Sequence, residues 1–469
     1  MIKKTLPLII SMVITGCVAI PNIESPAIEG QTITSLNNQS YTIKREKWWT
    51  ELNNKQLNQL MIVILDNNKD LKLLDIKIAK IQEQYQLNNA NKKIGIDLEA
   101  TANKQRLSGN SFNTAEYSNR IIDNDSLSLN ANYDVDLFKK IQHFGNQYMS
   151  LQAAEKLNKQ WSELNISNQV VKLYADFTFY NNQSRLLIEQ KEIYQELLEL
   201  EQYKVSIGTS IDDEVLKLKN NIKDMNTLIV DNTTSLQLTK NSLMLLGNNN
   251  DKINKILAVN TVDLYKTELK LPEYYTAEVI TERPDVKYYL YNIDAQEEQL
   301  EALKADFYPN ITITGTAGFE SITPNLLLSK SSLFATISPT LKLPIFDSGR
   351  IKSNYRLAGF DLNTFIENYN KTISTALKDI NDNVYKLRKE KNSLENSFSK
   401  YENKKTIFNN MSTRYKYGTI SRYEFVQERD QLLSEERNNN KQLLSRFNQQ
   451  IDLINALGGI NIINQKAGA

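Results

Sequence analysis

The chain has 469 residues, of which 41% are apolar, and its 56 basic and 55 acidic residues leave a net charge of +1. This balance gives no electrostatic attraction to nucleic acid. One histidine and one cysteine leave little material for a metal site or a Cys–His nucleophile, and no Gly-rich phosphate loop or Gly-x-Ser-x-Gly turn is present. The sequence therefore predicts a protein that is not an enzyme and that has no cofactor.

The amino-terminal residues 1–16 have the pattern of a secretory signal. Lys3 and Lys4 precede the apolar stretch Leu6–Ile14, which is too short to span a bilayer comfortably. Small residues then lead into Cys17, and because it is the only cysteine, no internal disulfide can form.

The junction at Cys17 resembles the lipobox of bacterial lipoproteins. That resemblance implies a covalent diacylglyceryl group on Cys17, with an incidental thiol as the alternative. Val18 follows instead of an aspartate, which by the same resemblance permits sorting to the outer membrane. We therefore predict a lipidated segment over residues 17–50.

A first β-hairpin is predicted at about residues 97–137. From Leu127 to Leu137 the odd positions are apolar and the even positions are polar, and Leu98–Leu107 is a weaker case of the same alternation. A polar loop, Ser108–Asp125, joins the two strands.

A long helix and a shorter returning helix are predicted next, as an arm over residues 139–246. Between Gly145 and Gly208 lie 62 residues without proline or glycine, and 38 more separate Gly208 from Gly247. At 1.5 Å per residue the first helix would be about 90 Å long. A compact globular domain has no use for a helix of that length.

The second half of the sequence contains a similar hairpin, at about residues 310–344. Its strands are Ile311–Phe319 and Leu333–Leu343, which alternate in the same way, and its polar loop is Glu320–Ser332. A second arm follows over residues 350–457.

In this second arm the residues that break helices, proline and glycine, are spaced much as in the first arm. Between Gly359 and Gly418 lie 58 residues without proline or glycine, and 39 more separate Gly418 from Gly458. The sequence again predicts a long helix and a returning helix.

Apolar residues recur in both arms at alternating steps of four and three, which predicts side-by-side helix packing. In the first arm they are Leu218, Ile222, Met225, Ile229, Leu236, Leu243 and Leu246, and in the second Leu387, Leu394, Phe398, Tyr401, Phe408 and Tyr415. A plain coiled-coil rod would show the same pattern.

The strands distinguish a plain coiled-coil rod from a protein that also enters a membrane. Segments of this length and alternation are typical of transmembrane barrel strands, although one such strand alone could belong to a soluble sandwich. Four strands cannot close a barrel in lipid, where every strand edge must be paired. We therefore predict that several copies of the chain share one barrel.

The two halves form an internal repeat, predicted as 51–260 and 261–469. The landmarks that recur are Phe138 and Phe346, Gly208 and Gly418, and Leu246 and Leu457, at spacings of 208, 210 and 211 residues. Each half is predicted to contain a helix, a hairpin, a long helix and a returning helix.

Several short motifs follow one another in a fixed order along the mature chain. They are Trp48-Trp49, Asp134-Val-Asp-Leu-Phe138, Arg283-Pro-Asp-Val286, Phe307-Tyr-Pro-Asn310 and Leu343-Pro-Ile-Phe-Asp-Ser-Gly-Arg350. In this order they resemble the TolC family of outer-membrane efflux proteins, specifically its lipoprotein branch of the OprM/NodT type. Lys139-Lys140 departs from the usual Gly-Arg of the family.

The resemblance implies a mainly α-helical fold with a membrane β-barrel portion. It also implies a homotrimer in the outer membrane, whose shared barrel continues as a helical tunnel in the periplasm. The implied partners are a periplasmic adaptor and an inner-membrane pump of the RND type, and the implied function is passive exit of drugs or other small molecules. Two alternatives remain open: a duct for type I protein secretion, and a non-conducting structural lipoprotein.

The resemblance further places a gate at the helix turns that contain Gly208 and Gly418. It implies gating roles for Tyr415 and Glu424, and Arg422 lies close to the position of an arginine in the family. A ring of three Glu424 side chains would bind cations and raise the pKa of each carboxyl. The alternative for Glu424 is a solvated acid on a helix surface.

Asp212, Asp213 and Glu214 follow the first turn. They are predicted to be acidic residues at a helix amino terminus, where the helix dipole favours negative charge. A contact with the adaptor is the alternative.

Overall fold

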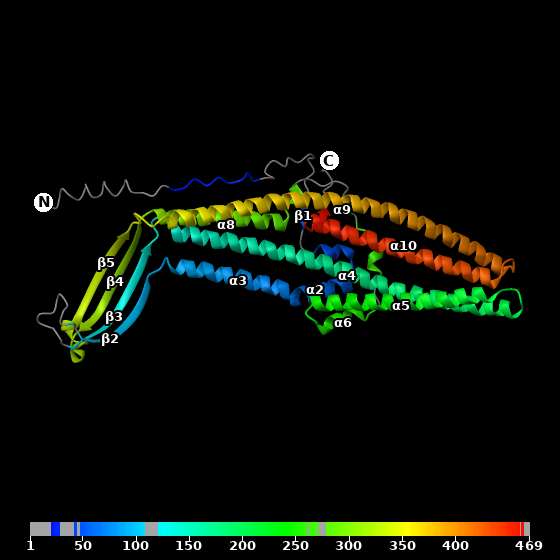
Figure 1. The fold of residues 1–469 in the computed structure, drawn as a ribbon, viewed down its shortest axis with the longest axis horizontal. Coiled ribbons are helices and arrows are strands. Elements are labelled where there is room, and N and C mark those ends of the chain that lie inside the picture. The colour runs from blue at the N-terminus through cyan, green and yellow to red at the C-terminus, as the bar shows by residue number, and fades with distance from the viewer. Residues whose placement is uncertain are drawn as a thin grey trace. The chain divides into compact units, whose positions relative to one another are not determined.

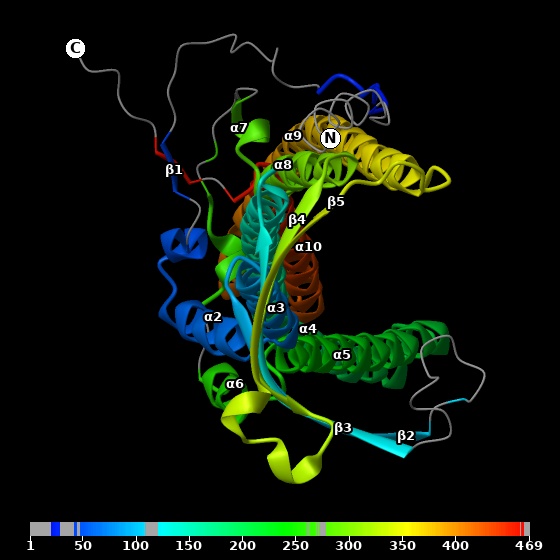
Figure 2. The same ribbon diagram turned by 90° about the vertical axis from the view of Figure 1, so that its left-hand side faces the viewer.

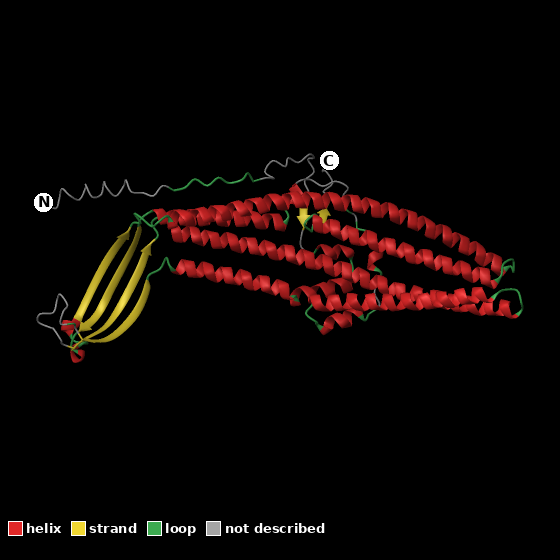
Figure 3. Ribbon diagram, in the orientation of Figure 1, coloured by secondary structure: helices red, strands yellow, loops and turns green. Residues whose placement is uncertain are grey.

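The computed structural model describes residues 20–28, 42–44, 47–106, 108, 121–259, 262–269, 271, 278–459 and 461–463. The predicted signal segment and Cys17 lie outside these described residues, as does most of the predicted loop 108–125. Over the described part the fold is mainly α-helical with a small amount of β-structure (Figure 3).

The chain forms two compact units, and both halves of the sequence contribute to each. Unit 1 comprises Met1–Ile28, Ile76–Lys156 and Tyr288–Tyr369, and unit 2 comprises Glu29–Asp75, Leu157–Lys287 and Asn370–Ala469.

Unit 1 contains one antiparallel sheet, whose four strands are β2 (Gly95–Arg106), β3 (Ile121–Val135), β4 (Asn310–Ser321) and β5 (Leu333–Lys342). Their order in the sheet is β2-β3-β4-β5, and the strands lie side by side in Figure 1. The alternating segments are thus strands as predicted, except that β3 begins before Leu127 and ends before Leu137. Pairing of β3 with β4 joins the two hairpins.

The main helices repeat in pairs of similar or equal length. They are α3 (Lys69–Ala90) and α8 (Pro284–Lys304), then α4 (Lys140–Ser206) and α9 (Arg350–Lys416), each of 67 residues, and finally α5 (Asp212–Leu246) and α10 (Arg422–Ala456), each of 35 residues. This confirms the predicted repeat of helix, hairpin, long helix and returning helix. Among the described helices, none is both long enough and apolar enough to cross a membrane.

The remaining elements are short. They are β1 (Thr42–Lys44), η2 (Trp48–Leu52), α2 (Lys55–Asn67), α6 (Asp251–Leu257), η3 (Leu264–Lys266), α7 (Glu278–Thr281), η4 (Ala305–Phe307), η5 (Pro324–Leu326), η6 (Lys330–Ser332) and β6 (Asn461–Ile463). β1 and β6 pair with each other.

α4 begins at Lys140 and α9 at Arg350, next to the predicted arm starts at 139 and 350, and the two helices run through Gly145 and Gly359. A glycine inside a helix costs only about 1 kcal/mol relative to alanine, so it does not stop a well-supported helix. Carboxylates set the starts instead. The Asp136 carboxylate accepts the backbone N–H of Ile141 at 2.9 Å, and Asp347 accepts that of Ile351 at 2.7 Å.

In unit 2, the heptad positions of α5 form a packing seam, as predicted. Leu218, Met225, Asn232 and Thr239 are buried at steps of seven, and Leu243 is buried four residues further on. The buried Asn232 amide donates to the Tyr180 carbonyl at 3.0 Å and to the Ser184 hydroxyl at 2.7 Å, so α5 is held against α4 in one register.

Arg283 of the predicted Arg-Pro-Asp motif joins several segments of unit 2. Its side chain is buried, pairs with Asp285 at 2.8 Å and donates to the Ala456 carbonyl at the end of α10 at 2.5 Å. Its guanidinium also lies 5.1 Å from the ring centroid of Trp161 on α4. Arg283 therefore satisfies a carbonyl at the end of α10 and links it to α4 and α8.

Candidate functional site

The sheet of unit 1 has one apolar face. Its register aligns Leu98 with Leu129, Leu129 with Ala317, and Ala317 with Ala335. Apolar positions of all four strands therefore share one side. Leu98, Leu129 and Ile337 are 69%, 52% and 80% exposed, which would be costly in water and is expected for a face that contacts lipid.

The opposite face of the sheet is polar. Its aligned positions include Glu99, Asn130, Thr312 and Asp134. The Asn130 amide donates to Glu99 at 2.9 Å, and the Thr312 hydroxyl donates to Asp134 at 2.7 Å. The sheet is therefore suited to separate lipid from water.

The sheet has two open edges. Among the described strands, β2 and β5 each pair on one side only, and the four strands form one curved layer (Figure 2). Pro339 lies in the middle of β5, where its missing N–H is tolerated at an edge. The backbone groups of these edges require partners in a membrane.

Both long helices end at their turn glycines, in unit 2. Gly208 has φ +74° and donates to the Val205 carbonyl at 2.9 Å, while the N–H of Thr209 reaches the Lys204 carbonyl at 2.9 Å. This is a Schellman motif, in which glycine adopts the left-handed conformation without steric cost. Gly418 repeats it with φ +71°.

The three predicted acidic residues after the first turn lie in the first turn of α5, as expected for a helix amino terminus. They are Asp212, Asp213 and Glu214. Glu214 also pairs with Lys217 of the same helix at 2.5 Å.

Glu424 belongs to a capping box at the start of α10. Its carboxylate accepts the backbone N–H of Ser421 at 2.8 Å, and the Ser421 hydroxyl accepts the N–H of Glu424 at 3.2 Å. The hydrogen bond from the Ser421 backbone lowers the pKa of Glu424 below its ordinary value. Its role in a gate stays a prediction.

Tyr415 and Arg422 meet in a cluster that we call the tip clasp, made of Glu196, Tyr415, Arg422 and Phe425. The rings of Tyr415 and Phe425 stack with centroids 4.9 Å apart, and the Arg422 guanidinium lies 5.5 Å from each of them. Arg422 Nε is 2.6 Å from a Glu196 carboxylate oxygen on α4, and this hydrogen bond raises the pKa of Arg422. The tip clasp therefore ties the α9–α10 hairpin to α4.

A second contact joins the α9–α10 hairpin to the α4–α5 hairpin. The Lys204 ammonium lies 3.5 Å from the ring centroid of Tyr423, and its position is fixed by the buried carboxylate of Glu201 at 3.0 Å. The Ser210 hydroxyl donates to the same carboxylate. Sequence reasoning missed Glu196, Lys204, Glu201, Tyr423 and Phe425.

No local pattern could have found the tip clasp, because Arg422 and Glu196 are 226 residues apart in the sequence. The heptad pattern indicates only that Tyr415 faces a helix. It does not say which helix supplies the partner.

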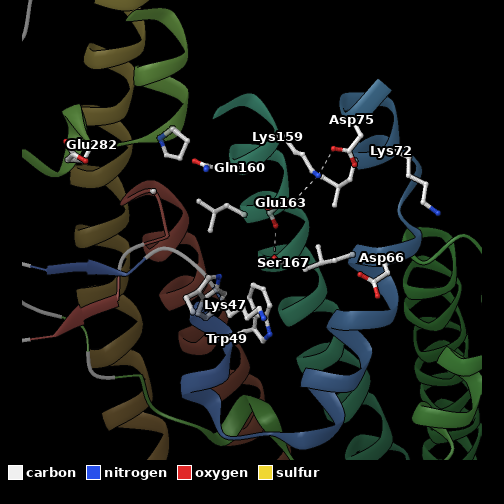
Figure 4. Close-up of a pocket in the computed structure, with 16 residues that line it drawn as sticks. Lys47, Trp49, Asp66, Lys72, Asp75, Lys159, Gln160, Glu163, Ser167 and Glu282 are labelled. Carbon is white, nitrogen blue, oxygen red and sulfur yellow. Dashed lines mark hydrogen bonds and ion pairs between the residues drawn. The ribbon is translucent and has the colours of Figure 1, made fainter. Parts of the chain in front are cut away.

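Unit 2 also contains an open pocket of about 1170 Å³ between η2, the α2–α3 segment and α4 (Figure 4). Lys159 points toward Asp75, with Nζ 2.6 Å from the carboxylate, and Ser167 donates to the Glu163 carbonyl at 2.6 Å. Acidic and basic side chains are both present in the lining, so the pocket indicates no particular ligand chemistry.

Comparisons with known proteins match most of the chain to one family. The model of a family described as outer membrane efflux protein matches residues 61–249 and 276–459. The chain is 24% identical to the cation efflux system protein CusC of Escherichia coli, over 97% of this chain and 99% of that protein. It is also 24% identical to the toluene efflux pump outer membrane protein TtgI of Pseudomonas putida, over 97% and 98% of the two chains.

Solved structures have the same fold. The CmeC outer membrane channel of Campylobacter jejuni superposes with a TM-score of 0.81 and 21% identity, covering 96% of each chain. The outer membrane protein VceC of Vibrio cholerae gives a TM-score of 0.77 and 20% identity, covering 89% of this chain and 99% of that one. The predictions of a TolC-type fold, of an outer-membrane location and of an efflux function are thereby confirmed, and the chain belongs to the outer membrane efflux protein family.

Proposed function

We propose that three copies of this chain form the passive exit duct of a tripartite efflux system. The observation that carries the proposal is the four-stranded sheet with one apolar face, one polar face and two open edges. One copy cannot satisfy both edges, whereas a ring of copies pairs β5 of one with β2 of the next.

The dimensions of the apolar face support a barrel wall. The outward-facing positions from Leu127 to Val135 are apolar, and Asp125 and Asp123 follow toward the loop. Nine residues at about 3.3 Å each, tilted by about 40°, span a height of about 23 Å, close to the apolar band of about 25 Å in outer-membrane barrels. The polar face would then line the lumen.

The partners follow from the kind of machine. A duct supplies no energy, so an inner-membrane pump, of the RND type by the resemblance, must deliver the cargo, and a periplasmic adaptor must connect the two. The relative TtgI is named as part of a toluene efflux pump and CusC as part of a cation efflux system. We propose small molecules as the cargo class.

Anchoring and gating complete the proposal. Cys17 would carry the covalent lipid, which would be the only attached group. The tips near Gly208 and Gly418 would be the gate. The tip clasp would hold the gate closed, and Glu424, Asp212, Asp213 and Glu214 would set the charge around the opening.

Planar-bilayer recording tests the proposal directly. Purified protein in detergent should run as a trimer by mass and should insert to give unitary conductance steps. A non-conducting structural lipoprotein would give none, and that result would refute the duct.

Deleting the gene should raise intracellular drug accumulation. Loss of a secreted protein with unchanged accumulation would instead favour type I secretion.

A further inference from the structure

The two faces of the sheet in unit 1 differ in charge. Four carboxylates lie on the polar face, and they belong to Asp97, Glu99, Asp134 and Glu320. Among the described strand residues of this face, the only cation is Lys342, at the end of β5. Four negative charges against one positive charge leave the polar face with a net charge of −3 in each copy of the chain.

The charges on the apolar side of the sheet are balanced, and they lie beyond its apolar positions. They belong to Lys104 and Arg106 on β2 and to Asp123 and Asp125 on β3. Lys104 and Asp123 are directly opposite each other and form an ion pair at 3.4 Å. The excess of negative charge therefore belongs to the polar face alone.

The four carboxylates of the polar face keep their charge available to the solvent. All four residues are exposed, and none has an ion-pair partner within the described part of the chain. The Asn130 amide donates to Glu99, and the Thr312 hydroxyl donates to Asp134. Both donors are neutral groups, so these hydrogen bonds cancel no charge.

A barrel shared by three copies is narrow enough for such charges to act on ions at its axis. Twelve strands about 4.8 Å apart and tilted by about 40° give a circumference of about 75 Å and a backbone radius of about 12 Å. The Debye length is about 10 Å in 0.1 M salt and about 3 Å in 1 M salt. The field of the wall therefore reaches the axis in dilute salt and is largely screened in concentrated salt.

We propose that the inner wall of the barrel makes the duct selective for cations, with Asp97, Glu99 and Glu320 as selectivity-determining residues. The negative wall raises the local concentration of cations and lowers that of anions, so cationic and neutral small molecules pass more readily than anionic ones. The inference rests on the proposed function, because that function turns the polar face toward the lumen. It concerns the strands of unit 1 and does not depend on Glu424 at the tip.

The reversal potential in planar bilayers under a twofold KCl gradient tests this inference. At 0.1 M against 0.2 M KCl we expect K⁺ to be preferred over Cl⁻ about sevenfold, since a wall potential of about one kT per unit charge changes the concentration of each ion about 2.7-fold. The preference should fall markedly at 1 M against 2 M KCl.

A triple variant, Asp97→Asn, Glu99→Gln and Glu320→Gln, leaves Asp134 to balance Lys342, so the wall becomes neutral. Its permeability ratio should fall to about one. Both proteins are also compared in a Tyr415→Ala background, in which a wider tip is expected to limit the current less.

Asp125→Asn is the matched control. Asp125 pairs with Ser321, the neighbour of Glu320, but lies on the opposite face, so this variant loses the same charge outside the lumen. It should keep the wild-type ratio. A preference for anions, an unchanged ratio in the triple variant, or an equal loss in Asp125→Asn would overturn the inference and leave the duct standing. A ratio that falls in Glu424→Gln but not in the triple variant would do the same. If no conductance is seen, the duct fails and the inference fails with it.

Discussion

At the turns of the two arms, single side chains connect hairpins that are far apart in the sequence. Arg422 makes three contacts there, with Glu196, Tyr415 and Phe425, so its charge and its planar shape are both used. A salt bridge at an exposed position contributes little by itself, because water screens it. The contacts of Arg422 with two rings that stack on each other make this salt bridge more restrictive than an isolated pair.

Replacing Arg422 by glutamine should loosen the tip. The Arg422→Gln variant loses the contact with Glu196 and the charge over the two rings, so the α9–α10 hairpin is less firmly held. We expect a higher single-channel conductance than in the wild type, and Tyr415→Ala should act in the same direction. Lys378→Gln is a control, because it breaks an exposed ion pair with Asp382 within α9 alone. Equal conductance in wild type and Arg422→Gln would remove the tip clasp from the gate.

Glu424 gives a prediction about pH. Hydrogen bonds from Ser421 lower its pKa below the ordinary 4.5, so its capping contribution is complete above about pH 4.5 and is lost as the pH falls through the lower folded value. Conductance should therefore rise in a step below pH 4.5, and Glu424→Gln should abolish that step.

A ring of three Glu424 carboxylates predicts the opposite shift of the Glu424 pKa. Mutual repulsion would raise their pKa, and the step would then lie above pH 4.5. The midpoint of the step, measured in planar bilayers, separates the two roles. Asp382→Asn serves as the control, because the pKa of Asp382 is also lowered, by the hydrogen bond from Lys378 within α9, away from the tip.

Cys17 is predicted to be the site of lipid attachment. Cells grown with radioactive palmitate should label the wild type and not Cys17→Ala, because the thiol is the acceptor. Purified Cys17→Ala protein should still conduct, since the strands and the arms do not depend on the lipid. Persistent label in the variant would contradict the assignment.

At the scale of elements, the strands were predictable because alternation reports directly on the two faces of a sheet. The register that pairs Leu127 with Phe319 keeps the alternating apolar positions of β3 and β4 on one side, as the alternation requires. Glycine and proline spacing alone does not locate the helix starts, because Asp136 and Asp347 cap them and Gly145 is tolerated inside α4. The predicted arm starts at 139 and 350 nevertheless lie within one residue of the observed ones. The tip clasp was also out of reach, since packing between hairpins leaves no local pattern.

Gly318 marks a point where β3 and β4 approach closely. A Cβ atom at this position would lie 2.2 Å from the Leu127 carbonyl oxygen and 2.6 Å from the Ser128 Cα, and backbone atoms cannot easily move away. Gly318→Val should therefore disrupt pairing of the two hairpins, and we expect little assembled trimer in outer-membrane fractions.

Gly315→Ala is the matched control on the same strand. A Cβ atom there would lie 3.9 Å from the Ala131 Cβ, which is an ordinary contact. This variant should assemble like the wild type. Normal assembly of Gly318→Val would show that the close approach is not required in the barrel.

At the scale of the whole molecule, the two faces of the sheet should respond oppositely to charge. Leu129 and Asn130 are neighbours on β3, at similar depth but on opposite faces. An arginine on a lipid-facing position near the bilayer midplane costs about 2–4 kcal/mol, whereas the lumen is solvated. Because three copies would each carry the substitution, the cost to one barrel is threefold. Leu129→Arg should therefore strongly reduce the heat-modifiable trimer on gels, and Asn130→Arg should assemble normally but conduct less. Normal assembly of both variants would mean that the apolar face does not contact lipid, and the shared barrel would then have to be abandoned.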